Sequence, residues 1–137
     1  MKTLAIDHGD KKIGLAISDE TGLIARPLKI IRHKSRAADA QAVADLAIAE
    51  NAEQIILGLP LGDDGEDTPQ SRAVRRFAEA LREVCSLPLI FADESHSSTE
   101  AALLRRASGA KRKKRREPDD ALAAAVVLQN YLESKKT

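Results

Sequence analysis

The sequence opens with Met1-Lys2-Thr3-Leu4-Ala5-Ile6-Asp7-His8-Gly9, in which a short apolar run ends at an acidic residue and a glycine soon follows. The apolar run predicts a buried strand with Asp7 at its tip. A second run, from Lys12 to Ser18, follows at once and predicts a β-hairpin whose turn occupies residues 8–11. Because a strand holds its last side chain rigidly, Asp7 is well suited to be a metal ligand. The rest of the chain is interpreted around this residue.

The remaining sequence predicts a single α/β domain over residues 1–137. Hydrophobic periodicity indicates further strands at 28–32, with Pro27 at the edge, and at 54–58 and 87–92. Helices are predicted at 35–51, 70–84, 97–106 and 118–133. Short turns make the first three strands antiparallel, whereas helix–strand alternation is typical of parallel strands. We therefore expect a mixed five-stranded sheet flanked by helices.

The composition excludes several classes of protein. Hydrophobic residues make up 43% of the chain but aromatic residues only 2%, which argues against binding of single strands by base stacking. No apolar run approaches the roughly 20 residues of a membrane span, and the short apolar stretch after Lys2 predicts no signal peptide. Cys85 is the single cysteine and allows no internal disulfide, so we expect a cytoplasmic protein.

Positive charge is concentrated near the C-terminal end. Residues 105–116 hold eight of the 22 lysines and arginines and no acid, which leaves 14 basic against 21 acidic residues elsewhere. Such a run is often only a solvated loop, but beside an acidic site it would supply contacts to phosphate. The hairpin lysines could act likewise, or could simply be exposed turn residues. The candidate nucleic-acid-binding residues are Lys11, Lys12, Lys111, Arg112, Lys113, Lys114, Arg115 and Arg116.

Acidic residues follow two predicted strands. Asp7 ends the first strand, and Asp93 and Glu94 end the fifth. Because parallel strands present their C-terminal ends at one edge of a sheet, Asp7 and Glu94 are expected on adjacent strand tips. An aspartate at a strand end can also merely stabilise the next turn, so Asp7 alone does not define a site.

A third group of acids opens the last predicted helix. Glu117 and Asp119 belong to it, as does Asp120, which is in line with Ala124 and Leu128 and is therefore expected to face the sheet. The helix dipole alone would favour acids in this turn. Together with the strand-end acids, however, they would provide oxygen ligands for Mg²⁺ or Mn²⁺. A pair of such ions activates water and stabilises the leaving oxygen at a phosphodiester.

Four motifs, in this order and over nearly the whole chain, resemble those of the YqgF family, also called RuvX. Residues 7–16, Asp7-His8-Gly9-Asp10-Lys11-Lys12-Ile13-Gly14-Leu15-Ala16, resemble its opening D-x-G-x-K-x-I-G-x-A. Gly58-Leu59-Pro60-Leu61 with Gly65 resembles its GLP loop, and residues 93–101 resemble its D-E-R-x-[ST]-T-x-x-A. Residues 120–132 resemble its closing D-x-x-A-A-x-x-L-Q-x-Y-L, with one extra residue before Leu128. The resemblance implies an RNase H-like fold.

The resemblance also implies which residues act. Asp7, Glu94 and Asp120 would be the catalytic carboxylates and the ligands of Mg²⁺ or Mn²⁺, and Glu117 stands where related resolvases carry a fourth acid. Ser95 departs from the family, which usually has an arginine there. This departure leaves the carboxylates in place but changes the expected contacts to the substrate.

The implied function is a metal-dependent endonuclease that hydrolyses phosphodiester bonds. Its substrate would be the 5′ end of pre-16S rRNA or Holliday junction DNA, and the residues do not decide between them. Junction resolution needs two symmetric cuts and would imply a homodimer. One alternative is a non-catalytic nucleic-acid-binding or ribosome-associated protein on the same fold. Another treats Asp7-x-Gly9 as the phosphate loop of an actin-like or sugar-kinase-like ATPase, which would need a second domain that 137 residues do not provide.

Overall fold

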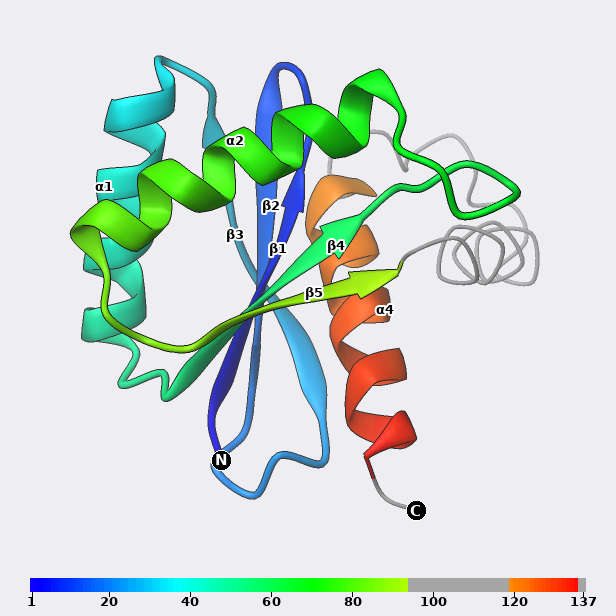
Figure 1. Cartoon of the computed structure of the whole chain (residues 1–137). Helices are drawn as coiled ribbons and strands as arrows, with labels where there is room; N and C mark the ends of the chain where they lie inside the picture. Colours follow the sequence, from blue (N-terminus) through cyan, green and yellow to red (C-terminus); the bar gives the residue numbers. More distant parts are fainter. Residues whose placement is uncertain (94–118, 136–137) are drawn as a thin grey trace.

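The structure is a computed structural model that describes residues 1–93 and 119–135 (Figure 1), with the backbone alone described at 119 and 120. The strands are β1 (Thr3–His8), β2 (Lys12–Ser18), β3 (Ala25–Arg32), β4 (Gln54–Leu59) and β5 (Leu89–Asp93). The helices are α1 (Arg36–Ala49), α2 (Pro69–Val84) and α4 (Asp119–Ser134). The helix predicted at 97–106 lies outside the described residues. None of the helices described is long and apolar enough to cross a membrane.

The five strands form one mixed sheet in the order β3-β2-β1-β4-β5. β1 pairs antiparallel with β2, and β2 with β3, whereas β1–β4 and β4–β5 are parallel. The predicted mixed sheet is therefore confirmed. The expectation of adjacent tips for the first and fifth strands is wrong, because β4 lies between β1 and β5. Each crossover adds its new strand outside the previous one, which puts β5 at the edge.

Helices cover both faces of the sheet. α1 and α2 lie on one face and α4 lies on the other (Figure 1). Because side chains alternate along a strand, Leu4 and Ile6 of β1 belong to the core under α1 and α2, whereas Ala5 belongs to the core under α4. The α4 side is built from small and aliphatic residues, including Ala5, Ala16, Ile56, Ala124, Val127 and Leu128.

β3 begins three residues earlier than predicted and contains Pro27. A proline lacks the backbone N–H that a central strand needs, so a strand with an internal proline is normally an edge strand. β3 is an edge of this sheet, and its register with β2 shifts between Leu15 and Ala16, opposite Lys29 and Pro27. The edge position thus explains why Pro27 is tolerated inside the strand.

Polar side chains fix where α1 and α2 begin. The Ser35 side chain accepts a hydrogen bond from Ala38 N and caps α1, as predicted. Thr68 caps α2 through Ser71 N, and Ser71 Oγ in turn accepts from Thr68 N. Ser71 Oγ also donates to Asp67, the last acid of the loop that follows β4. This loop therefore uses one of its acids to hold the start of α2.

Candidate active site

Asp7 is the next-to-last residue of β1 and is half-buried. It lies on the same face of the sheet as Ala5, because the two residues are two positions apart and side chains alternate between the faces along a strand. The next residue, His8, faces the other way, and its ring packs against Phe77 of α2 with 4.9 Å between the ring centroids. Asp7 therefore lies on the face of the sheet that α4 covers, and the His8 ring lies beneath α2.

The environment of His8 favours its neutral form. Burial lowers the pKa of His8, and this effect outweighs the nearby Asp39 and Asp10 carboxylates, which act in the opposite direction. The neutral ring contributes packing against Phe77 rather than positive charge at the end of β1.

The first turn of α4 lies beside the end of β1. Ala124 is fully buried in the cluster that contains Ala5. Asp120 is one helical turn before Ala124, about 6 Å along the helix, and Asp7 is two residues beyond Ala5, about 7 Å along the strand. In Figure 1, α4 runs roughly antiparallel to β1, so both steps lead toward the same end of the sheet. The fold thus brings the backbone positions of Asp7 and Asp120 together.

β5 points toward the same edge of the sheet. Phe91 packs against the core under α1 and α2, whereas Ala92 packs against the cluster under α4. Asp93 ends the strand as an exposed residue opposite Leu59 of β4. The predicted site residue Glu94 follows in the sequence, two positions after Ala92, and lies outside the described residues, as does Glu117.

A carboxylate donor set suits a hard divalent cation such as Mg²⁺ or Mn²⁺. The half-buried carboxylate of Asp7 on a rigid strand has that chemistry. Within residues 1–93 and 119–135, no three His, Cys, Asp or Glu side chains form a group that could hold a metal ion. The predicted set takes Glu94 from outside this part of the chain and Asp120 from a position whose side chain is not described.

The predicted basic residues fall into two groups. Lys11 is exposed in the β1–β2 turn, and Lys12 is the half-buried first residue of β2. Both lie at the end of the sheet where Asp7 is found, since His8 is opposite Ile13 in the hairpin register. The basic residues Lys111, Arg112, Lys113, Lys114, Arg115 and Arg116 lie outside the described part of the chain.

A contact between His33 and Asp39 at the start of α1 was not predicted from the sequence. His33 Nδ1 lies 2.5 Å from Asp39 Oδ2, and Asp39 Oδ1 accepts a hydrogen bond from Lys34 N at 3.0 Å. Asp39 is only 2% exposed. His33 is itself exposed and contacts this buried carboxylate. An acid in the first turn of a predicted amphipathic helix was the only available signal.

Comparison with known proteins gives a consistent result. Residues 1–134 match the family described as "RuvX: Holliday junction resolvase". Proteins named "Putative pre-16S rRNA nuclease" from Caldanaerobacter subterraneus subsp. tengcongensis and Thermoanaerobacter pseudethanolicus are 39% and 40% identical over 137 residues, which is 99% of this chain and of each relative.

The fold is similar to those of solved resolvases. Thermus thermophilus RuvC, solved in complex with Holliday junction substrate, has a TM-score of 0.61 and 16% identity, over 98% of this chain and 95% of that one. The fowlpox virus resolvase, in complex with substrate Holliday junction DNA, has a TM-score of 0.60 and 17% identity, over the whole of both chains. At these identities the likeness establishes a common resolvase-type fold.

Proposed function

From the premise that this chain belongs to the RuvX family, we propose that it hydrolyses phosphodiester bonds of nucleic acid at the end of β1. It is a nuclease, and the proposed catalytic carboxylates are Asp7, Glu94 and Asp120, with Glu117 as a fourth acid. The observation that carries this assignment is the position of half-buried Asp7 on the α4 face, beside the first turn of α4.

The proposed cofactor is Mg²⁺ or Mn²⁺, held by Asp7, Glu94 and Asp120. Such an ion would lower the pKa of a bound water and offset negative charge on the phosphate. The product would be a 3′-hydroxyl and a 5′-phosphate. The protein's own contribution is rigidity, because β1 is paired on both sides, to β2 and to β4, so Asp7 is held on a central strand.

Contacts to the phosphate backbone would come from basic residues outside the acidic group. Lys11 and Lys12 lie at the same end of the sheet as Asp7. Residues 111–116 supply six more positive charges directly before Glu117 in the sequence. These contacts would add affinity and salt dependence without choosing a sequence.

Precursor 16S rRNA is the favoured substrate. It is named for relatives that are 39–40% identical over the whole chain, whereas Holliday junctions are named in the description of the family as a whole and in solved structures at 16–17% identity. Junction cleavage would further require a homodimer with paired sites. The single cysteine, Cys85, supports action in the reducing cytoplasm.

The decisive experiment compares wild type with Asp120→Asn in Mn²⁺ and in EDTA. Substrates are an RNA that spans the 5′ end of precursor 16S rRNA and a four-way DNA junction. We expect wild-type cleavage that needs the metal, loss of cleavage in Asp120→Asn, and a preference for RNA. Asp119→Asn is the matched control, because it removes one charge from the same helical turn, and it should retain cleavage.

One residue favours a second candidate function. Ser95 replaces an arginine that is usual in this family, which would be compatible with a protein that binds nucleic acid without cutting it. Binding by wild type without cleavage of either substrate in Mn²⁺ or Mg²⁺ would favour this alternative and would contradict the nuclease assignment.

A further inference from the structure

A second basic stretch lies on β3 and the turn that follows it. Residues 21–38 contain five lysines and arginines and no acid, although the chain outside residues 105–116 is acidic overall. All five side chains belong to exposed residues, namely Arg26, Lys29, Arg32, Lys34 and Arg36. Positive charge in this protein is therefore not confined to its C-terminal part.

The strand register places one of these residues on the face that carries Asp7. Asp7 is opposite Gly14 of β2, and Gly14 is opposite Ile30 of β3. Residues opposite one another share a face, and so do residues two apart. Arg32 and Lys12, which lie opposite one another, are therefore on the same face as Asp7. They are two residues further toward the end of β1 than the row formed by Asp7, Gly14 and Ile30.

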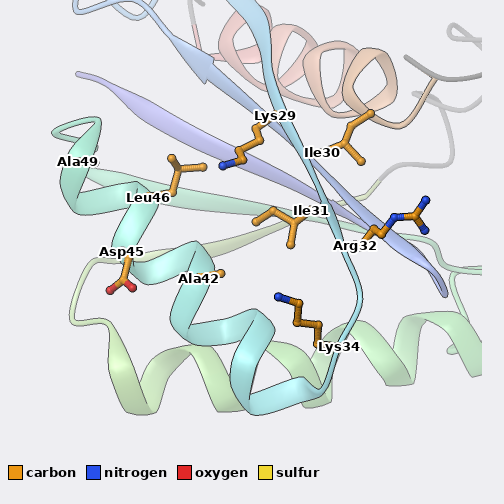
Figure 2. Close-up of a pocket in the computed structure, with 9 residues that line it drawn as sticks. All are labelled: Lys29, Ile30, Ile31, Arg32, Lys34, Ala42, Asp45, Leu46 and Ala49. Carbon is orange, nitrogen blue, oxygen red and sulfur yellow. The ribbon is translucent and has the colours of Figure 1, made fainter.

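The neighbouring basic residues of β3 and its following turn point the other way. Figure 2 shows Lys29, Ile31 and Lys34 directed toward α1, while Ile30 and Arg32 are on the opposite side of β3. Lys29 lies opposite Leu15, which belongs to the core under α1 and α2. Arg32 and Lys29 thus carry the same charge on the same strand but face different sides of the sheet.

α4 leaves Arg32 accessible. Gln129 of α4 binds the start of β3, where its side chain accepts from Ala25 N at 2.9 Å and donates to Leu23 O at 3.1 Å. The first residue of α4 is ten residues before Gln129, about 15 Å along the helix. β3 runs about 23 Å from Ala25 to Arg32. The helix therefore begins short of Arg32, which is exposed.

Arg32 is within reach of the same nucleic acid strand as Asp7. Two strand spacings separate them across the sheet, about 10 Å, and two residues along it, about 7 Å. The Cα positions are thus about 12 Å apart, and a strand of nucleic acid carries one phosphate at every nucleotide, at a rise of about 3.4 Å along the duplex axis. A phosphate near the scissile bond can therefore lie over Arg32.

We propose that Arg32, with Lys12 opposite it, binds a backbone phosphate of the nucleic acid that flanks the scissile bond at Asp7. This inference rests on the proposed function and extends it to a residue of the edge strand. A guanidinium binds phosphate through two parallel hydrogen bonds. Arg32 forms no ion pair with another residue of the described chain.

Prevention of aggregation is an alternative role for the charged residues of β3, but it does not distinguish Arg32 from Lys29. Charged side chains on an edge strand discourage pairing with another sheet. That role applies to Lys29 and Arg32 alike and does not depend on the face. Only the phosphate-binding role distinguishes the residue on the Asp7 face from the residue on the α1 face.

The test compares Arg32→Gln with Lys29→Gln, each of which removes one positive charge from β3. The dissociation constant is measured in EDTA, so that no cleavage occurs, over a range of salt concentrations. Two probes are compared first, the precursor rRNA and the four-way junction. The test then uses the one that the wild-type protein binds more tightly. We expect Arg32→Gln to weaken binding about tenfold at low salt and to lower the salt slope by about one. Lys29→Gln should match wild type.

Equal effects of the two substitutions, or no effect of either, would overturn the inference. Lys12→Gln provides an independent check, since the proposal requires it to reduce the salt slope as Arg32→Gln does. The outcome is separate from that of the nuclease assignment. Normal cleavage by wild type with unchanged binding by Arg32→Gln would contradict only the phosphate contact. If wild type does not cleave, but Arg32→Gln still weakens binding in EDTA, only the nuclease assignment is contradicted.

Discussion

Ala124 of α4 is fully buried in the same apolar cluster as Ala5 of β1, and this cluster holds α4 against the central strand. Asp7 is two residues beyond Ala5, and Asp120 is one helical turn before Ala124. Small side chains allow a close approach of helix and sheet. The proximity of the backbone positions of Asp7 and Asp120 therefore depends on the packing of the neighbouring alanines, Ala5 and Ala124.

Enlarging Ala124 should disturb both stability and activity. Ala124→Leu adds three carbon atoms where no space is available, so we expect a loss of about 1–3 kcal/mol in the free energy of unfolding. Cleavage should fall more than stability alone explains, because α4 is pushed away from β1. Denaturant unfolding and single-turnover cleavage check this. Ala123→Leu, at a half-buried position of the same helix, should be milder in both assays. Equal effects at the two positions would contradict the argument.

Replacing Asp7 should separate catalysis from binding. Asp7→Asn keeps the size of the side chain but removes the charge that a divalent cation needs. We expect cleavage to fall below detection, with nucleic-acid binding unchanged or tighter because one repulsive charge is lost. Thermal unfolding in the absence of metal checks that the variant is folded. Normal cleavage by this variant would show that Asp7 is not a ligand of the catalytic metal.

The buried carboxylate of Asp39 should be a strong determinant of stability. It is 2% exposed and accepts a hydrogen bond from Lys34 N, with His33 Nδ1 2.5 Å away. Asp39→Ala removes a buried carboxylate and leaves the part-buried Lys34 N–H without its partner, so we expect a loss of about 1–3 kcal/mol in the free energy of unfolding. Asp39→Asn, which keeps an acceptor oxygen, should lose less.

Denaturant unfolding measures both Asp39 variants. The matched control is Asp45→Ala, since Asp45 is an exposed acid of the same helix and should change stability by no more than about 0.5 kcal/mol. Similar losses for Asp39→Ala and Asp45→Ala would mean that the buried contacts contribute nothing.

Asp19 should make the β2–β3 turn sensitive to acid. A hydrogen bond from the Thr21 hydroxyl, followed by one from Leu23 N, lowers the pKa of Asp19 to about 2 from its ordinary 3.8. Because the pKa is lower in the folded state, the ionised carboxylate stabilises the fold above about pH 4, and this contribution is lost as the pH falls toward 2.

Thermal unfolding of Asp19→Asn tests this at a series of pH values. The difference in Tm between wild type and the variant should be largest at neutral pH and should shrink between pH 4 and pH 2. Glu20→Gln removes the neighbouring acid and is the control for the loss of one negative charge from this turn. A difference that is constant with pH would contradict the hydrogen-bonded role of Asp19.

The periodicity of the sequence alone predicted most of the elements that are described. The run before Asp7 predicted β1, and Ser35 correctly marked the start of α1. Both predictions depend on neighbours in the sequence, because alternation and capping are local properties of the chain. The mixed character of the sheet also followed, since short turns favour antiparallel pairs and helical crossovers favour parallel ones.

The tertiary structure decided which elements became neighbours. Local patterns indicate which side of a strand is buried, but they carry no information about which strand lies next to it. The insertion of β4 between β1 and β5 and the position of Arg32 on the face of Asp7 follow from strand order and register. These depend on how the crossovers pack against the sheet, which involves residues far apart in the sequence.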